Sequence, residues 1–222
     1  ESRGLGDVYK RQGRVIKTRF ISNGRERFGM AYHFFAMVSR MKYIDRWALM
    51  RNTRQENLTE HSHEVAVIAH ALAVLRNRRF GGHVDAARAA LLGLYHDLPE
   101  TLTGDLPTPV KYHNPEIRAA YQAVEDSACS KLTSMLPEDL RPDYEPFFFP
   151  AQVDAPLWPL VKAADKISAL AKCMEEEKAG NREFIRAKSA LLASIHAMRL
   201  PEAECFLAEF LPGYALTLDE LE

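Results

Sequence analysis

Cysteine is scarce in this chain and long apolar runs are absent, and both features narrow its class. The three cysteines, Cys129, Cys173 and Cys205, are scattered and odd in number, so they predict free thiols in a reducing compartment. Because no Cys-X-X-Cys pair occurs, the sequence argues against a structural zinc ribbon. No apolar stretch reaches membrane-spanning length and no signal segment opens the chain, so we expect a cytoplasmic protein without a membrane partner.

Net charge is also nearly absent, at −1, but it is unevenly distributed. Residues 1–29 carry eight basic and three acidic residues, whereas residues 30–222 carry 21 basic and 27 acidic residues. Residues 7–12, DVYKRQ, are a direct translation of the transposon-end adapter used in sequencing libraries. We therefore expect residues 1–29 to be a non-native or disordered tail, and the natural start to be Met30. The mildly acidic remainder argues against binding of polymeric nucleic acid.

Repeats, low-complexity stretches and convincing strand alternation are missing as well, whereas helical periodicity is frequent. Residues 137–156 contain five prolines and are predicted to be mostly loop. The sequence predicts a single all-α domain over residues 30–222. Its expected helices are 31–42, Thr59 (as N-cap) to about Arg79, Asp85 (as N-cap) to about Leu98, 115–135, 157–178, 182–198 and a short one opened by Pro201.

Two of these helices carry histidines at informative positions, and one of these histidines is followed directly by an aspartate. His61 precedes Val65 by four residues and so extends the apolar stripe of its helix toward the interior. His63 lies about 200° further round the helix and is expected to be peripheral. His96-Asp97 ends the next helix. A single interior histidine is more often a core residue than a ligand, so the prediction rests on the combination.

Asp165 lies on the apolar face of a third helix, in line with Val161 and Trp158. A carboxylate there is unfavourable unless it is paired or binds a metal. The alternative to a metal ligand is a salt bridge with Lys162 or Arg186.

Two histidine nitrogens and two carboxylate oxygens suit Mn, Co, Fe or Zn better than Ca or Mg. Such an ion polarises a phosphoryl group and lowers the pKa of a bound water, which favours phosphate-ester hydrolysis. Glu100, one turn after His96, is placed to orient or deprotonate that water. Alone, Glu100 would be read as a solvated carboxylate at a helix end.

Two further segments are candidates for substrate contacts. In Arg46-Trp47 the arginine can bind a phosphate bidentately, and the tryptophan can pack on a sugar or a base. A core tryptophan beside a surface arginine is an equal alternative. The polar loop over residues 101–108 can hold phosphate or sugar, unless it is an ordinary Pro/Gly turn.

Taken together, these motifs resemble those of bacterial 5'-deoxynucleotidases of the HD-domain superfamily. An isolated His-Asp pair is weak evidence, but the combination is specific and spans the chain from about Met30 to its C-terminus. The matching strings are DRWALMRN (45–52), EHS (60–62), YHD (95–97) with Glu100, LTGDLPTPVK (102–111), KAAD (162–165) and LDE (218–220).

The resemblance implies an HD-domain helical bundle, a homodimer, and metal-dependent hydrolysis of deoxyribonucleoside 5'-monophosphates to deoxynucleoside and phosphate. Glu100 would activate water, Arg46 would meet the phosphate, and Trp47 would crowd the sugar 2' position against ribonucleotides. The implied metal ligands are His61, His96, Asp97 and Asp165. The implied nucleotide contacts are Arg46, Trp47, Asp97, Asp165 and the run Asp105, Leu106, Pro107 and Thr108.

One departure from the family pattern is the run Phe147-Phe148-Phe149-Pro150, where we expect a more acidic loop. It would alter the pocket rim or a dimer contact, and with it the base preference. Other HD-type activities, such as a nucleoside triphosphate triphosphohydrolase or a cyclic-nucleotide phosphodiesterase, remain alternatives. So does a non-catalytic nucleotide-binding module.

Overall fold

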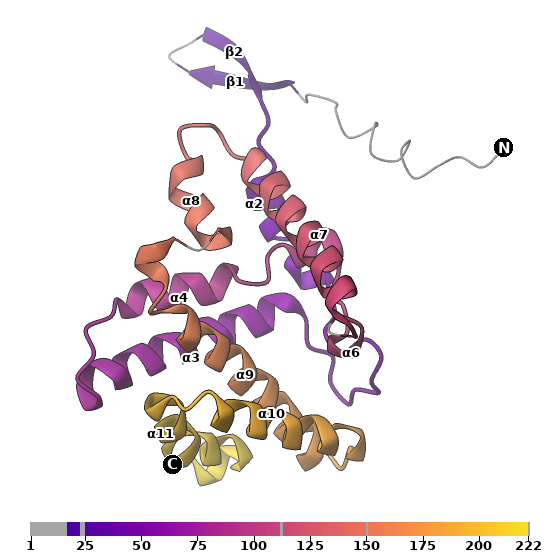
Figure 1. Cartoon of the computed structure of the whole chain (residues 1–222). Helices are drawn as coiled ribbons and strands as arrows, with labels where there is room; N and C mark the ends of the chain where they lie inside the picture. Colours follow the sequence, from indigo (N-terminus) through magenta and orange to yellow (C-terminus); the bar gives the residue numbers. More distant parts are fainter. Residues whose placement is uncertain (1–16, 23–24, 112, 150, 222) are drawn as a thin grey trace, which may run out of the picture.

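Three helices from the middle of the chain meet at the centre of the protein (Figure 1). The computed structural model describes residues 17–22, 25–111, 113–149 and 151–221, with side chains from residue 31 onward except those of 108 and 109. Helix α3 (Leu58–Arg79) packs along α4 (Ala86–Tyr95), and α9 (Trp158–Lys178) contacts both. The predicted apolar stripe of α3 is buried in this contact, with Val65, Ile68 and Leu72 nearly inaccessible to solvent.

The starts of α3 and α4 are fixed by side-chain caps. Asn57, rather than the predicted Thr59, caps α3, because its side chain accepts hydrogen bonds from the Thr59 and Glu60 amides. Glu60 completes a capping box by accepting from the Asn57 amide. Asp85 caps α4 as predicted. Helix α4 ends at Tyr95, three residues before the expected Leu98, and this brings His96 and Asp97 into the turn that follows.

A second group of helices packs against the Tyr95 end of α4. It comprises α2 (Phe34–Val38), α5 (Glu100–Thr103), α6 (Thr108–Lys111), α7 (Pro115–Ser134) and α8 (Arg141–Phe148). Buried Phe34 is the centre of this group and contacts the ring of Tyr144 in α8 at 5.1 Å between centroids. The helix expected over residues 31–42 is therefore shorter, and is followed by a 3-10 turn at Met41–Tyr43.

The prediction that residues 137–156 are mostly loop is wrong for α8. Proline lies among its first residues, where helical amides lack partners in any case, and only Pro146 lies inside the helix. Phe147 is buried and stacks on Tyr95 at 4.8 Å between ring centroids. In the phenylalanine run, Phe147 thus contributes to the core, whereas Phe149 is exposed. Pro150, the last residue of that run, lies outside the described residues.

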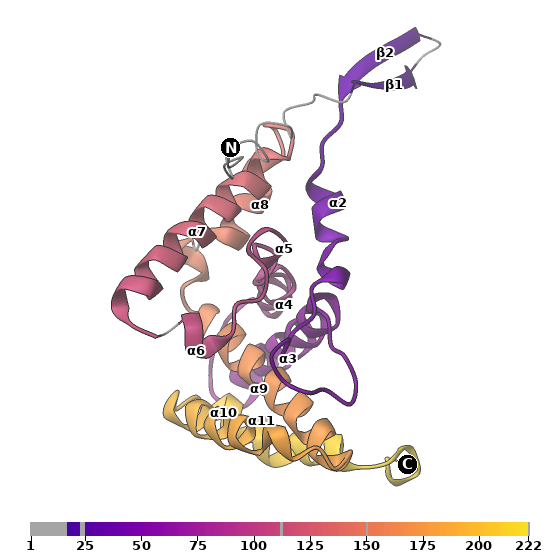
Figure 2. The ribbon, with the colours of Figure 1, turned by 90° about the vertical axis from the view of Figure 1, so that its right-hand side faces the viewer.

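The C-terminal helices lie at the end of the helical body opposite α8 (Figure 2). Helix α10 (Ile185–Ala197) packs on α9, and α11 (Pro201–Glu209) packs mainly on α3. Pro201 opens α11, as predicted. Short 3-10 turns at Gln152–Asp154, Arg182–Phe184, Leu211–Ala215 and Leu218–Glu220 complete the described elements.

A β-hairpin precedes the helical body and points away from it (Figures 1 and 2). Strands β1 (Lys17–Ser22) and β2 (Arg25–Met30) pair antiparallel, from Lys17 opposite Met30 to Ser22 opposite Arg25. The expectation of no strand is wrong here, whereas the all-α prediction is confirmed for the body. The rest of the predicted tail, residues 1–16 and 23–24, lies outside the described residues. Among those described, no helix has the length and apolarity needed to cross a membrane.

Candidate metal and nucleotide site

Two imidazoles face each other where α3 and α4 meet α9. His61 lies in the first turns of α3 and is completely buried, as the phase of its helix predicts. His96 directly follows α4. The two ring centroids are 5.4 Å apart. His63 is exposed on the outer side of α3, also as predicted.

Carboxylate oxygens lie next to both imidazoles. Asp165 Oδ1 is 3.2 Å from His61 Nε2. Asp97 Oδ2 lies 3.1 Å from His96 Nε2 and 3.5 Å from His61 Nε2. Within the described part of the chain, neither Lys162 nor Arg186 forms an ion pair with Asp165. The structure therefore does not show the salt bridge that was the alternative role of Asp165.

This arrangement fits a divalent cation. The ligand atoms of His61, His96 and Asp165 all lie within 4.8 Å of one another. Two opposed metal–ligand bonds of about 2.1 Å would span about 4.2 Å, so these atoms need only small shifts to share one ion. The Nε2 atoms of His61 and His96 are buried, and among the described residues the nearby carboxylate oxygens lie close to them without forming aligned hydrogen bonds. Buried nitrogens without such a bond are unfavourable in a protein interior unless a ligand satisfies them.

The electrostatics of this group depend on burial and on opposite charges. Burial, followed by the positive charge of Arg46, lowers the pKa of His61, so this imidazole is neutral. Burial alone would lower the pKa of His96, but the Asp97 carboxylate raises it to about 9. Burial likewise opposes ionisation of Asp97, yet His96 holds the pKa of that carboxyl well below its usual range. Burial also opposes ionisation of Asp165, but His61 lowers its pKa, so both carboxylates are ionised and can bind a cation.

Glu100 opens α5, three residues after Asp97, and is buried. Burial, followed by the negative charges of Asp97 and Asp105, raises the pKa of Glu100 to about 9. The reading of Glu100 as a solvated carboxylate is thus wrong. Its strongly shifted pKa beside a group of candidate ligands is typical of a functional carboxyl.

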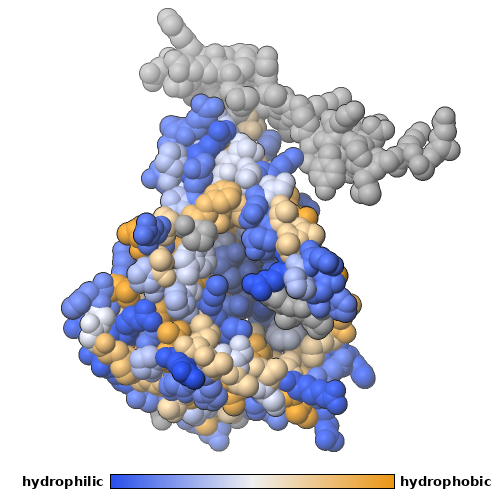
Figure 3. Space-filling model, viewed as in Figure 1, coloured by the Kyte–Doolittle hydropathy of each residue, from blue (hydrophilic) through white to orange (hydrophobic). Residues whose placement is uncertain are grey.

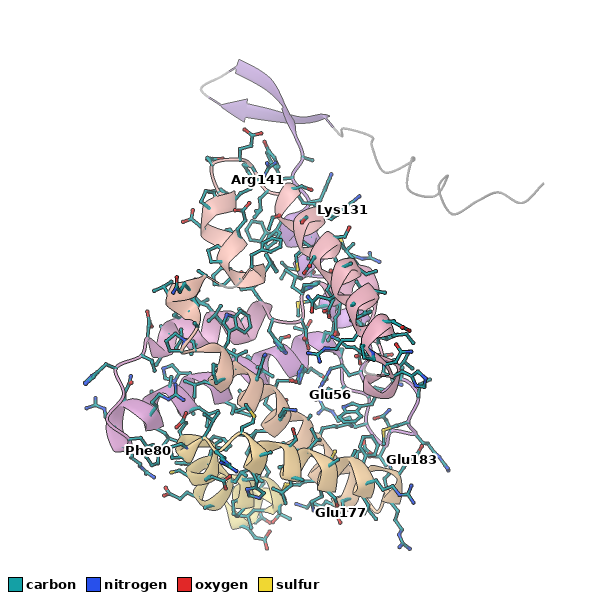
Figure 4. The ribbon with its side chains drawn as sticks, viewed as in Figure 1. Glu56, Phe80, Lys131, Arg141, Glu177 and Glu183 are labelled. Atoms are coloured by element: carbon teal, nitrogen blue, oxygen red, sulfur yellow. The ribbon has the colours of Figure 1, made fainter. Side chains whose placement is uncertain are left out.

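Arg46 and Trp47 share one carboxylate oxygen. Glu56 Oε2 accepts hydrogen bonds from Arg46 Nη1 at 2.8 Å and from Trp47 Nε1 at 3.2 Å. Figure 4 labels Glu56 in the interior of the helical body, and its side chain is buried. Burial opposes the charge of Arg46, but Glu56 and then Asp165 raise the pKa of its guanidinium. Arg46 is therefore a buried, paired cation and not a surface arginine.

Trp47 has a backbone conformation that is rare for a residue with a side chain. Its φ is 59°, in the left-handed region. The Asn52 amide donates to the Trp47 carbonyl at 3.2 Å, and the indole lies 5.3 Å from the Phe184 ring between centroids. An unfavourable backbone geometry that is held by several contacts is common at ligand sites.

A cavity of about 690 Å³ opens beside Arg46 and Trp47. Asp105 and Pro107 line it together with Lys166, which directly follows Asp165 in α9. The remaining wall is mostly apolar and is formed by Ala48, Leu49, Met50, Ala187, Ala190, Leu191 and Ser194. Of the other predicted contacts, Leu106 does not line the cavity, and the side chain of Thr108 lies outside the description.

Two residues that contact the candidate site were not predicted from the sequence. Ser168, which contacts His61, lies one helical turn after Asp165, so its position on the same face was an available signal. No sequence signal pointed to Glu56, because its role depends on how the loop after Trp47 returns to the start of α3. That return is a short antiparallel pairing, in which the Arg46 amide donates to the Glu56 carbonyl at 2.9 Å.

Known proteins similar to this chain share both its sequence and its fold. The chain matches the family described as 5'-deoxynucleotidase YfbR-like over residues 33–214. It is 50% identical to a 5'-deoxynucleotidase of Vibrio vulnificus over 189 residues, covering 85% of this chain and 97% of that protein. It is 51% identical to the 5'-deoxynucleotidase YfbR of Escherichia coli, covering 85% and 95% of the two chains.

Solved structures agree with this fold. An HD-domain phosphohydrolase of Listeria innocua superposes with a TM-score of 0.72 at 26% identity, covering 82% of this chain and 88% of that one. The cyanophage S-2L HD phosphohydrolase DatZ, bound to dA and one catalytic Zn²⁺ ion, superposes with a TM-score of 0.58 at 16% identity, covering 80% and 96%. At that identity the second likeness shows the fold alone. The chain belongs to the YfbR-like 5'-deoxynucleotidase family, and its helical body has the HD-domain fold.

Proposed function

We propose that this protein is a metal-dependent 5'-deoxynucleotidase, which hydrolyses deoxyribonucleoside 5'-monophosphates to deoxynucleoside and phosphate and selects against ribonucleotides. The observation that carries the proposal is the group of His61, His96 and Asp165, whose ligand atoms lie within 4.8 Å of one another. The curated relatives at about half identity are named 5'-deoxynucleotidases, which supports the same activity.

Four side chains are proposed to hold one divalent cation: His61, His96, Asp97 and Asp165. Their two imidazole nitrogens and two carboxylate oxygens favour Co, Mn or a similar transition metal. When bound, such an ion polarises the phosphoryl group and lowers the pKa of a water molecule. Asp97 and Asp165 are also proposed to lie next to the bound phosphate, since they border the same group.

The roles of the remaining site residues follow from their charge and position. Arg46 is proposed to bind the phosphate through guanidinium nitrogens not used by Glu56. Trp47 is proposed to occupy the space that a ribose 2' hydroxyl would need. Glu100 is proposed to accept the proton of the attacking water, because it is a buried carboxyl beside the candidate ligands and a bound cation would favour its ionised form.

The cavity has room for the rest of the nucleotide. Asp105 and Pro107 line it, and with Leu106 and Thr108 they are proposed to contact the substrate. Its volume of about 690 Å³ and its mainly apolar wall are typical of small-molecule sites. The apolar part, beyond Trp47, is proposed to receive the base.

The test is phosphate release from matched deoxy- and ribonucleoside 5'-monophosphates, with Co²⁺, Mn²⁺, Mg²⁺ or a chelator present. We expect metal-dependent release from the deoxy series only, and no turnover by Asp97→Ala. A full rate in that variant would overturn the metal assignment. Release of triphosphate or opening of a cyclic nucleotide, without monophosphate hydrolysis, would overturn the proposed activity.

The variant Trp47→Ala tests the proposed selection against ribonucleotides. Removing the indole opens space at the sugar, so activity on ribonucleotides should rise relative to activity on deoxyribonucleotides. The ratio of kcat/KM for a ribo/deoxy pair with the same base measures this. An unchanged ratio would reject the proposed role of Trp47.

Three broader features belong to the same proposal. Residues 30–222 are proposed to be the functional domain, supported by a family match that begins at residue 33. A homodimer is proposed on the family resemblance, and light scattering would measure it. A cytoplasmic location is proposed on the scattered cysteines.

A further inference from the structure

A buried chain of hydrogen bonds leads away from the candidate metal site on the far side of His61. Ser168 Oγ lies 3.0 Å from His61 Nδ1, the ring nitrogen that faces away from His96 and Asp97. The same hydroxyl donates to Glu64 Oε2 at 2.6 Å. Ser168 is completely buried, so water does not compete for its hydroxyl. The chain therefore runs from His61 through Ser168 to Glu64.

Two helices supply this arrangement with the same spacing. Helix α3 carries His61 and, three residues later, Glu64, while α9 carries Asp165 and, three residues later, Ser168. Residues three apart lie on one helix face. On each helix one member of the pair belongs to the candidate metal site and the other to the hydrogen-bonded chain. The crossing of α3 and α9 thus fixes both sides of the His61 ring at once.

The hydrogen-bond donors and acceptors around His61 determine its tautomer. A serine hydroxyl has one proton and two lone pairs, and Ser168 donates its proton to Glu64. Toward His61 it can therefore only accept, so Nδ1 must carry a proton. A neutral imidazole with Nδ1–H leaves a lone pair on Nε2. That Nε2 is the buried nitrogen without an aligned hydrogen bond among the described residues.

The second imidazole of the site also has its Nδ1 held by an acceptor, in this case a backbone carbonyl. His96 Nδ1 lies 2.7 Å from the Gly93 carbonyl oxygen, which can only accept, so this nitrogen too carries a proton. Its Nε2 is also buried and without an aligned hydrogen bond in the described part of the chain. Both rings thus present Nε2 to the same space.

We propose that Ser168 and Glu64 are positioning residues that hold His61 in the Nδ1–H tautomer and aim its Nε2 at the metal. This inference rests on the metal site of the proposed function and extends it to two residues that do not touch the ion. Hydrogen bonds to the outer nitrogen of a metal-binding histidine fix the ring and strengthen its ligation. Removing such a partner typically weakens metal binding by about 10- to 100-fold.

The experiment is calorimetric titration of the metal-free protein with Co²⁺ or Zn²⁺. Ser168→Ala is expected to weaken binding by about tenfold or more. Ser62→Ala is the matched control: it removes a buried hydroxyl from the neighbour of His61, and that hydroxyl has no hydrogen-bond partner among the described residues. The control should bind the ion like the unchanged protein. Equal affinities for the two serine variants would overturn the inference.

A second variant, at Glu64, tests whether Ser168 and Glu64 act together, and it changes a residue that is not fully buried. Glu64 is only partly buried, so Glu64→Leu should fold. It frees the Ser168 proton to turn toward His61, and should also weaken metal binding. If the two residues act through one chain, the double variant should bind no more weakly than Ser168→Ala alone. Additive losses would contradict the proposal.

The readout also separates this inference from the proposed activity. Calorimetry measures binding of the ion alone, so a protein that binds Co²⁺ but cleaves no nucleotide would overturn the nucleotidase proposal and leave this one standing. A protein that binds neither ion would overturn the inference. In the Zn²⁺-loaded protein, ¹⁵N spectra of the His61 ring should show the proton on Nδ1, and a proton on Nε2 would refute the assigned tautomer.

Discussion

A single carboxylate oxygen of Glu56 holds the two residues proposed to contact phosphate and sugar. Both Arg46 Nη1 and Trp47 Nε1 donate to Oε2, and all three side chains are largely shielded from water. Hydrogen bonds to a buried charge are stronger than those between neutral groups. The proposed phosphate contact and the proposed sugar filter would therefore be coupled through Glu56, although Glu56 itself need not touch the substrate.

Glu56→Gln tests this coupling. The amide removes the negative charge opposite Arg46, so the guanidinium loses its fixed position, and kcat/KM for a deoxynucleoside 5'-monophosphate should fall about tenfold, which corresponds to about 1.4 kcal/mol. The ratio of deoxy to ribo activity should fall as well. Glu60→Gln is the control, since Glu60 is exposed and a glutamine can keep the capping box. Unchanged kinetics in Glu56→Gln would refute the coupling.

At the residue scale, helical phase predicted the buried histidine and the carboxylates well. His61 and Asp165 follow from their spacing to apolar neighbours in the same helix, and both take part in the group of candidate ligands. The partners of these residues could not be predicted. Glu56 and Ser168 act across contacts between segments far apart in sequence, and periodicity within one helix carries no information about such contacts.

Helices α3 and α4 pack closely against each other at Gly93 in α4. A Cβ atom added there would lie 3.1 Å from the Ala66 Cα and 3.2 Å from the Val65 carbonyl oxygen, both backbone atoms of α3. Backbone atoms of a buried helix cannot move aside as a flexible side chain can. The absence of a side chain at residue 93 thus allows α4 to bring His96 close to His61.

Gly93→Ala should therefore separate the two helices and destabilise the protein by about 1–3 kcal/mol, as overpacking of a core does. It should also weaken Co²⁺ binding, because α3 and α4 carry two of the proposed ligands. Chemical denaturation and calorimetry measure the two effects. Gly213→Ala is the control, since a Cβ there meets no atom within 4 Å. Equal stabilities of the two variants would contradict the packing argument.

Glu176, near the end of α9, anchors the loop that follows Trp47. Its carboxylate accepts from the Thr53 amide at 2.9 Å, the Asn181 amide group at 2.8 Å and the Lys172 ammonium at 2.5 Å. Burial alone would raise the pKa of Glu176, but these donors, Lys172 foremost, hold it at about 2. The ionised carboxylate thus stabilises the folded state and the position of the loop.

This lowered pKa gives a pH dependence with a definite sign. A carboxyl whose folded-state pKa lies below its unfolded one adds stability above about pH 4.5, and this is lost as the pH falls toward 2. For a shift of this size the contribution is about 3 kcal/mol. Glu176→Gln should remove it, so the two proteins should differ most in unfolding free energy above pH 5 and converge toward pH 2. Parallel pH profiles from urea denaturation would disprove this.

Secondary-structure elements were predicted well where an apolar pattern repeated over many residues. They were predicted poorly where the segment was short or rich in proline. Helices α3 and α9 have many buried positions, so their phase is unambiguous. Helix α8 was missed because five prolines in residues 137–156 suggested loop, although most of its hydrogen bonds do not need the amides that proline lacks. The hairpin was missed despite Asn23-Gly24, a strong turn signal in the sequence.

At the scale of the whole molecule, the face seen in Figure 3 mixes apolar and polar patches. Exposed apolar side chains such as Tyr43, Val153 and Leu218 come from different elements. Scattered exposed apolar residues are normal on a soluble surface. The cavity beside Trp47 is different, because its apolar wall is continuous over α10 and the loop after Trp47. The cavity therefore lies between α10 and the loop that carries the residues proposed to contact the substrate.

The hairpin of β1 and β2 stands apart from this organisation. Figures 1 and 2 both show β1 and β2 extending away from the helices, and the described partners of each strand are residues of the other. An isolated two-stranded hairpin is marginally stable in water. The family match begins at residue 33, after the hairpin, and the residues proposed to bind the metal and the nucleotide all follow it. The helical body should therefore fold and act without it.

A variant beginning at Met30 tests this expectation directly. The two described strands of this segment pair with each other, so on loss of residues 1–29 the unfolding free energy should stay within about 0.5 kcal/mol. Co²⁺ affinity and kcat/KM for a deoxynucleoside 5'-monophosphate should be unchanged for the same reason. Denaturation, calorimetry and phosphate release on the full chain provide the comparison. A clear loss in stability or activity would show that the N-terminal segment is part of the functional domain.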